Sequence, residues 1–174
     1  MTLKQKLASG EIINGIMLSE LYTPNIIRVL KNCGYDFVLV DCEHGYFDLS
    51  HTANLIALAD GINLPLIVRA TYNSKDDISK YLDMGAQGIL MSNVTSVQQA
   101  AELVDLCLYA PLGNRGISTF RAHTGYHSGN IKETLSRANA RTIVIAQIES
   151  PEGDALVDDI LDKPQPVQQW VQWQ

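Results

Sequence analysis

The stretch DFVLVDCEHG at residues 36–45 decides the fold. After Asp36 comes the wholly apolar run FVLV, and two acidic residues and a histidine follow where that run ends. A run that is apolar on both faces is typical of a strand buried in a parallel sheet, because a strand with one solvated face alternates. Comparable runs predict further strands at 12–18, 64–70, 85–94, 106–111 and 141–150.

Amphipathic stretches separate these runs and predict helices. Pro24 stands in the first turn of one and Ser96 is placed to cap another, and both are common helix-start signals. The predicted helices lie at 23–32, 48–60, 75–83, 96–105 and 130–139. Alternating strands and helices indicate a parallel sheet covered by helices, either an open doubly wound sheet or a (β/α)8 barrel. The length of 174 residues favours the open sheet, because barrels usually need about 250 residues.

Composition excludes several classes of function. The net charge of −6 argues against the nucleic-acid backbone as the main ligand, since such proteins present a basic face. Neither a G-x-G-x-x-G after the first predicted strand nor a G-x-x-x-x-G-K-S/T occurs, so a nucleotide site has no support. No run approaches the roughly 18 apolar residues of a membrane span, and no apolar segment follows the N-terminal lysines, as a secretory signal would require.

Cysteine usage and the end of the chain give two further expectations. The cysteines Cys33, Cys42 and Cys107 have no C-x-x-C spacing. Cys33 and Cys42 flank or end apolar segments, so we expect them to be buried free thiols in a reducing cytoplasm. Residues 163–174 are rich in glutamine and carry both tryptophans of the chain. We therefore expect one domain over 1–162 and an atypical tail over 163–174 that holds no strand of the sheet.

Polar residues gather where predicted strands end. His44 follows the strand at 36–45, Arg69 ends the next, and Gln147 and Glu149 end the strand at 141–150. In parallel α/β folds the carboxyl ends of the strands meet at one rim, where function is found. A histidine can move a proton at neutral pH and a fixed arginine can hold a developing oxyanion. Glu149 would ligate a divalent cation while Gln147 binds a substrate oxygen, and the set suits enolate chemistry.

Each residue also has a structural reading. His44 alone would be a structural hydrogen-bonding residue, and Arg69 would form a buried ion pair with Asp41 or Glu43. Glu149 would belong to the start of the helix that follows it. His123 and His127 have a helical zinc spacing, but the glycines at 125 and 129 argue against a helix there. His51 is expected on a helix surface.

Five ordered motifs resemble those of a known family. They are VDCEHGYFD (40–48), PLIVRA (65–70), YLDMGAQGILM (81–91), APLGNRG (110–116) and IAQIES (145–150). They look like successive motifs of the class II pyruvate-dependent aldolases of the HpcH/HpaI aldolase/citrate lyase family, over about residues 10–160. The resemblance implies a (β/α)8 barrel, here incomplete, with about six of eight strand-helix units.

The resemblance also implies an activity and roles for residues. The activity is metal-dependent, reversible aldol cleavage of a 4-hydroxy-2-oxo acid to pyruvate and an aldehyde, with Mg²⁺, Mn²⁺ or Co²⁺. His44 matches the family's base, Arg69 its enolate-stabilising arginine and Asp83 an aspartate that raises the basicity of the histidine. Glu149 matches a metal ligand and Gln147 a pyruvate contact, whereas Arg115 and Gly116 match a loop whose role is not specified.

One departure from the family weakens these expectations. The family continues into a Gly-Pro-x-Asp-Leu-like loop that supplies a second metal carboxylate, and nothing like it follows Asp162. We therefore expect a shortened chain, weak metal binding and an open sheet edge at 12–18 and at 141–150, with dimers or larger assemblies. The alternatives are a non-catalytic remnant that persists by association, and an open-sheet binding module for an anionic metabolite. The family implies a cytoplasmic homo-oligomer in aromatic or sugar acid catabolism.

Overall fold

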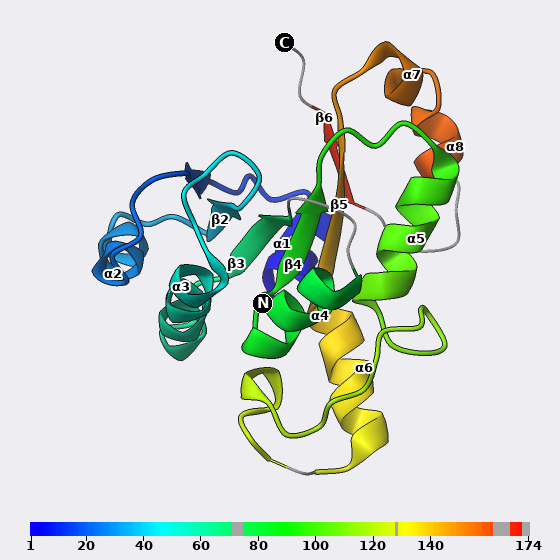
Figure 1. Cartoon of the computed structure of the whole chain (residues 1–174). Helices are drawn as coiled ribbons and strands as arrows, with labels where there is room; N and C mark the ends of the chain where they lie inside the picture. Colours follow the sequence, from blue (N-terminus) through cyan, green and yellow to red (C-terminus); the bar gives the residue numbers. More distant parts are fainter. Residues whose placement is uncertain (71–74, 128, 162–167, 172–174) are drawn as a thin grey trace.

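The computed structural model describes residues 1–70, 75–127, 129–161 and 168–171. All strands form one parallel sheet in which each strand pairs with the one before it in the chain (Figure 1). The strands are β1 (Gly15–Leu18), β2 (Phe37–Asp41), β3 (Leu66–Ala70), β4 (Gly88–Met91), β5 (Ile143–Ile148) and β6 (Gln168–Val171). A doubly wound sheet reverses its strand order at a switch point, whereas a barrel keeps the chain order. The topology is therefore that of a partial (β/α) barrel, as the resemblance implied and contrary to the expectation from length.

Helices connect the strands, and most begin with a side-chain cap. Asp48, Ser96 and Asn130 each accept a hydrogen bond from a backbone N–H of the helix they precede, which satisfies a group that the helix leaves unpaired. The main helices are α2 (Asn25–Asn32), α3 (Leu49–Gly61), α4 (Lys75–Met84), α5 (Val97–Cys107) and α6 (Ile131–Arg141). Shorter ones are α1 (Leu3–Ala8), η1 (Ala122–Thr124), α7 (Pro151–Asp154) and α8 (Val157–Leu161).

The sheet is buried on both faces, which explains the continuous apolar runs. The larger cluster of buried side chains lies on the face that α2–α5 cover and includes Val38, Val40 and Val68. A smaller cluster on the opposite face, which corresponds to the interior of a closed barrel, includes Leu39, Ile67, Leu90 and Ile145. Leu3 of α1 joins this second cluster, so α1 covers the interior face.

The predicted strand at 106–111 is wrong. Helix α5 continues to Cys107, and β4 pairs directly with β5. The apolar residues Leu103, Val104 and Cys107 are buried on one face of that helix. The segment that follows pairs with a side chain instead of a strand, because Asn139 Oδ1 accepts from the N–H of Tyr109 at 2.8 Å and Asn139 Nδ2 donates to its carbonyl at 2.9 Å.

The expected edge at 141–150 and the absence of a strand in the tail are also wrong. Gln168–Val171 forms β6, and it runs parallel to β5 with Gln147 opposite Trp170. In the part of the chain that the structure describes, β1 and β6 are therefore the outer strands of the sheet. Met17 on β1 has 43% of its surface exposed, as a side chain of an uncovered edge strand would.

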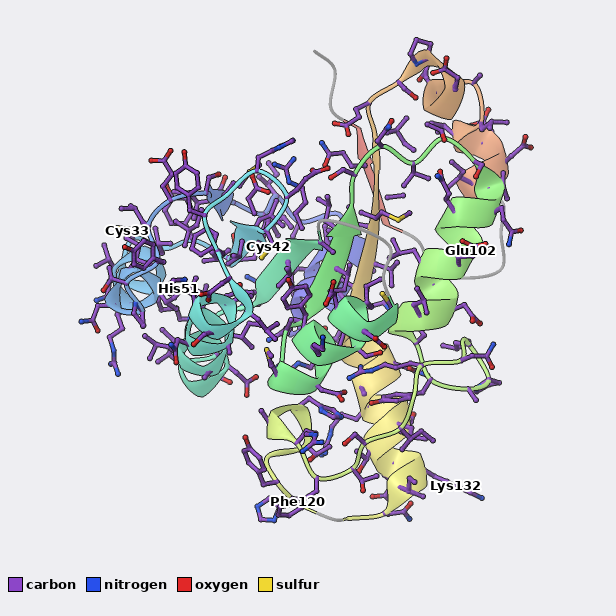
Figure 2. The ribbon with its side chains drawn as sticks, viewed as in Figure 1. Cys33, Cys42, His51, Glu102, Phe120 and Lys132 are labelled. Carbon is purple, nitrogen blue, oxygen red and sulfur yellow. The ribbon has the colours of Figure 1, made fainter. Side chains whose placement is uncertain are left out.

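Two of the three thiols are buried. Cys42 and Cys107 are buried, but Cys33 is exposed. Cys42, labelled in Figure 2, follows β2, and its Sγ lies 3.4 Å from Oγ1 of Thr52 on α3. Among the described residues, no helix is both long enough and apolar enough to span a membrane.

Candidate functional site

The carboxyl ends of β2 and β3 place two charged side chains side by side. Asp41 and Arg69 are register partners in the sheet. Leu39 and Ile67, two residues earlier on each strand, belong to the interior cluster, and side chains two apart on a strand share a face. Asp41 and Arg69 therefore rise from the interior face at the rim.

Asp41 and Arg69 form a bidentate ion pair. Arg69 Nε donates to Asp41 Oδ1 at 2.8 Å and Arg69 Nη2 donates to Asp41 Oδ2 at 2.5 Å. Arg69 is only 8% exposed and Asp41 only 2%, so water screens the pair little. This geometry confirms the ion pair with Asp41, which the sequence left as an alternative for Arg69.

The pair shifts the pKa values of both partners. Burial alone would raise the pKa of Asp41, but hydrogen bonds from Arg69 and from the N–H groups of His44 and Glu43 outweigh it and hold that pKa below its ordinary value. The hydrogen bond to Asp41 raises the pKa of Arg69 despite burial, and the charges of Glu43 and Glu149 raise it further. Both groups are therefore charged at neutral pH.

Glu43 and His44 follow β2 at the same rim. Glu43 Oε2 accepts from Ser92 Oγ at 2.5 Å and lies 3.4 Å from Arg69 Nε. The His44 side chain is 74% exposed, and its Nε2 lies 3.8 Å from Glu43 Oε2. The arrangement leaves an accessible imidazole beside a buried cation, with a carboxylate between them.

Gln147 and Glu149 approach the rim from β5. Gln147 is 2% exposed, and its Nε2 donates to Glu149 Oε2 at 2.8 Å. Glu149 is exposed and close enough to raise the pKa of Arg69. The structure therefore brings His44, Arg69, Gln147 and Glu149 to one edge of the sheet.

The donor set at this edge does not make a complete divalent-metal site. Magnesium and related cations prefer several oxygen ligands. Glu149 contributes its carboxylate, but Gln147 turns its amide nitrogen, which cannot ligate, toward that group. Glu43 is engaged by Ser92 and Arg69. The described residues hold no cluster of three or more His, Cys, Asp or Glu side chains arranged for a metal ion.

Asp83 lies at the other edge of the sheet. It is in the last turn of α4, which leads into the start of β4, whereas His44 follows the end of β2. Asp83 Oδ1 accepts from Arg115 Nη2 at 2.7 Å, and the Arg115 guanidinium lies 4.5 Å from the centre of the Tyr109 ring. Within one chain, the structure does not bring Asp83 to His44.

His123 completes the cluster around Asp83. Its Nδ1 lies 3.2 Å from the Asp83 carbonyl oxygen and its Nε2 lies 3.3 Å from the Tyr109 hydroxyl. Burial, followed by the nearby charge of Arg115, holds the pKa of His123 below its ordinary value. Figure 2 shows Phe120, on the same loop between α5 and α6, at the end of the molecule opposite α7.

The remaining candidate residues lie on elements other than β2, β3 and β5. His127 and Gly116 are exposed. His51 is on α3, where its Nδ1 lies 3.1 Å from Asp48 Oδ1.

Sequence reasoning assigned no separate role to Asp41, Glu43 and Ser92. Alternate residues of a strand share a face, so Asp41 could have been predicted to lie on the same face of the sheet as Leu39. Glu43 and Ser92 are indicated only by tertiary contact between the segments that follow β2 and β4.

Comparison with known proteins gives a consistent result. The family model of the HpcH/HpaI aldolase/citrate lyase family matches residues 16–170. The chain is 36% identical over 163 residues to a hydroxypyruvate/pyruvate aldolase of Roseobacter denitrificans, covering 92% of this chain and 62% of that protein. It is 32% identical over 162 residues to a 2-keto-3-deoxy-L-rhamnonate aldolase of Escherichia coli K12, covering 91% of this chain and 59% of that protein.

Solved structures agree. An HpcH/HpaI aldolase from Desulfitobacterium hafniense superposes with a TM-score of 0.91 at 31% identity, over 100% of this chain and 66% of that one. A family protein from Burkholderia cenocepacia superposes with a TM-score of 0.86 at 28% identity, over 97% of this chain and 67% of that one. The chain spans about three fifths of the length of the curated relatives it matches, at 62% and 59%.

Proposed function

This chain belongs to the HpcH/HpaI aldolase/citrate lyase family, and from that premise we propose that its rim serves aldol chemistry on pyruvate. The proposed reaction is reversible cleavage of a 4-hydroxy-2-oxo acid to pyruvate and an aldehyde. The buried pair between Arg69 and Asp41 is the observation that carries the proposal, because a preorganised cation is what a developing enolate needs.

Arg69 would bind the 2-oxo oxygen of the substrate. When the bond between C3 and C4 breaks, its electron pair forms the C2–C3 double bond and negative charge develops on that oxygen. The guanidinium charge stabilises this enolate more than it stabilises the neutral ketone, which is the condition for faster chemistry. The proton that the base has taken from the 4-hydroxyl is then delivered through water to C3 of the enolate, which gives pyruvate.

His44 would act as the base. It removes the proton of the 4-hydroxyl, through a water molecule, and the oxygen electrons form the aldehyde carbonyl as C4 leaves. The exposed imidazole is accessible to substrate and to water, and histidine is the side chain most often used for proton transfer at neutral pH. Gln147 would hydrogen-bond a substrate carboxylate or carbonyl oxygen. The described contacts lend no support within one chain to a part for Asp83 in this step.

A divalent cation would bind through Glu149. The described residues do not complete the coordination of such a cation. We propose dissociation constants in the millimolar range for Mg²⁺, Mn²⁺ or Co²⁺. Titration calorimetry that gave micromolar affinity would contradict that value and would mean that another carboxylate completes the site.

The remaining expectations extend the proposal. Relatives bear the names of hydroxypyruvate/pyruvate and sugar-acid aldolases, which supports small 2-oxo acids as substrates in aromatic or sugar acid catabolism. The proposed setting is a cytoplasmic homo-oligomer. The domain division at residue 162 stands as a further proposal, although β6 of the tail adds a strand to the same sheet.

A coupled assay tests the proposed function. The full chain is incubated with 4-hydroxy-2-oxopentanoate and Mg²⁺, and pyruvate release is followed through lactate dehydrogenase. We expect the wild-type chain to release pyruvate and His44→Asn to release it at least about 100-fold more slowly, the usual scale for loss of a general base. His51→Asn is the matched control, because His51 is a partly exposed histidine on α3 that contacts Asp48 and the ring of Tyr22. Equal rates for wild type and His44→Asn would refute the role of His44.

A further inference from the structure

The carboxylate of Asp41 binds more than Arg69. Its Oδ1 also accepts from the backbone N–H of Glu43 at 3.0 Å and from that of His44 at 3.1 Å. Ser19 Oγ lies 3.5 Å from Oδ2. One buried carboxylate therefore contacts both the guanidinium and the turn that carries the imidazole.

The contact with Asp41 fixes which edge of the guanidinium is left for a ligand. Nε–H and one Nη2–H point at Asp41, and Glu43 Oε2 lies on the Nε side at 3.4 Å. Within the described part of the chain, no hydrogen bond engages the two N–H groups of Nη1 or the outward Nη2–H, and these groups form a planar fork. Such a fork matches a pair of coplanar oxygens, which an enolate and its neighbouring carboxylate present.

We propose that Asp41 is a positioning residue that sets the orientation of Arg69 and of the His44 turn together. The inference rests on the proposed function and adds a residue to it. Asp41 touches no substrate in this account; it acts by aiming the Arg69 fork at the oxyanion while holding the backbone of His44 at a fixed place beside it. Displacement of a catalytic group by about 1 Å can cost about 100-fold in rate, so the coupling matters to the chemistry.

Glu43 differs from Asp41 in this respect. Its side chain is 26% exposed and contacts Arg69 only at 3.4 Å, whereas Asp41 is buried and bidentate. The Ser92 hydroxyl holds Glu43 Oε2 at 2.5 Å. Glu43 therefore supports one edge of the guanidinium, but the orientation of the fork follows Asp41.

Two substitutions separate the two halves of the proposed role. Asp41→Asn keeps an oxygen for the turn N–H groups but faces Arg69 Nη2–H with an amide N–H, so two donors oppose each other. Asp41→Glu keeps a carboxylate for Arg69 but moves it by one methylene from the turn. Asp48→Asn is the matched control, because Asp48 is an exposed helix cap and Asn caps equally well.

Hydrogen exchange followed by NMR measures both halves on the full chain. In Asp41→Asn we expect the Arg69 Nη2–H, whose acceptor Oδ2 is replaced, to exchange about 10-fold faster or more while the His44 amide changes little; in Asp41→Glu we expect the reverse. The Val68 amide in the core of β3 reports global opening and normalises both rates. Because each variant tests one half by itself, failure of one to fold leaves the other decisive.

The pyruvate reaction gives a second readout. We expect Asp41→Asn to lower kcat for C3 proton exchange of pyruvate about 100-fold with a smaller change in KM, and Asp48→Asn to leave both unchanged. An Arg69 Nη2–H that stays protected in Asp41→Asn, or a His44 amide that stays protected in Asp41→Glu, would overturn the proposal. If the wild-type chain exchanges no pyruvate protons, the proposed function fails, and the hydrogen-exchange rates still decide the role of Asp41.

Discussion

Removal of Asp83 tests whether this residue serves structure or chemistry. The Arg115 side chain is 2% exposed and pairs with Asp83, whose own side chain is 22% exposed. Asp83→Ala would leave a buried guanidinium without that carboxylate, a change that costs about 3–5 kcal/mol of unfolding free energy in buried pairs. The Tyr109 ring beneath Arg115 offsets about 1 kcal/mol of this, so we expect a loss of about 3 kcal/mol.

The reverse substitution should cost less. In Arg115→Met the carboxylate of Asp83 can be hydrated, because it is partly exposed, and methionine refills the space of the arginine stem. Loss of the hydrogen bond and of contact with Tyr109 should then cost about 1–2 kcal/mol. The double variant should be about as stable as Arg115→Met alone, which gives a coupling of about 3 kcal/mol between the two positions, equal to the loss in Asp83→Ala.

Urea unfolding followed by far-ultraviolet circular dichroism measures the four proteins of this cycle. A structural role for Asp83 predicts that the double variant regains both the stability and any aldolase activity that Asp83→Ala loses. A loss below about 1 kcal/mol in Asp83→Ala would mean that the Arg115 guanidinium does not depend on this carboxylate. Activity that stays absent in a stable double variant would show instead that Asp83 has a chemical role.

Three further predictions concern stability and assembly. His123 is surrounded by Asp83, Arg115, Arg141 and Tyr109, and its pKa is lower in the folded chain than in the unfolded chain. As the pH drops below about 6.5, the unfolded chain therefore takes up this proton first and the free energy of unfolding should fall. In thermal melts at several pH values, His123→Gln should reduce this pH dependence, whereas substitution of the exposed His127 by Gln should leave it unchanged. By urea unfolding, the free energy of unfolding of His44→Ala should lie within about 0.5 kcal/mol of wild type, because His44 is exposed. Arg69→Ala should lose about 3–5 kcal/mol, because it leaves the Asp41 carboxylate buried without its partner. Equal losses in the two variants would contradict the difference in burial. The outer strand β1, with Met17 exposed, should favour dimers or larger assemblies, and light scattering from one monodisperse monomer would be inconsistent with that.

The strands with continuous apolar runs were predictable, and the errors share a cause. β2 and β3 follow from FVLV and LIV, because only a strand covered on both faces tolerates such runs. The run at 106–111 has the same composition, but its backbone is satisfied by Asn139, from a segment 30 residues away. Half of β6 is glutamine, and it pairs because β5 offers an edge, not because glutamine favours strands.

The candidate site divides in the same way. Placement of His44, Arg69, Gln147 and Glu149 at one rim follows from strand direction alone. The partner of Arg69 did not, since the sequence offered Asp41 and Glu43 equally and only packing separates a buried bidentate contact from a longer one. The position of Asp83 beside Arg115 depends on a loop 32 residues further along the chain, and no local pattern encodes that contact.

Metal-supplemented proton exchange at C3 of pyruvate tests the central claim most directly. The full chain, with pyruvate and Mg²⁺ in deuterium oxide, is followed by proton NMR, and circular dichroism verifies the fold of each variant. We expect loss of the methyl signal with the wild-type chain and with His51→Ala, and no loss above background with Arg69→Ala or His44→Ala. Exchange by Arg69→Ala at the wild-type rate, or none by a folded wild-type chain, would contradict the central claim.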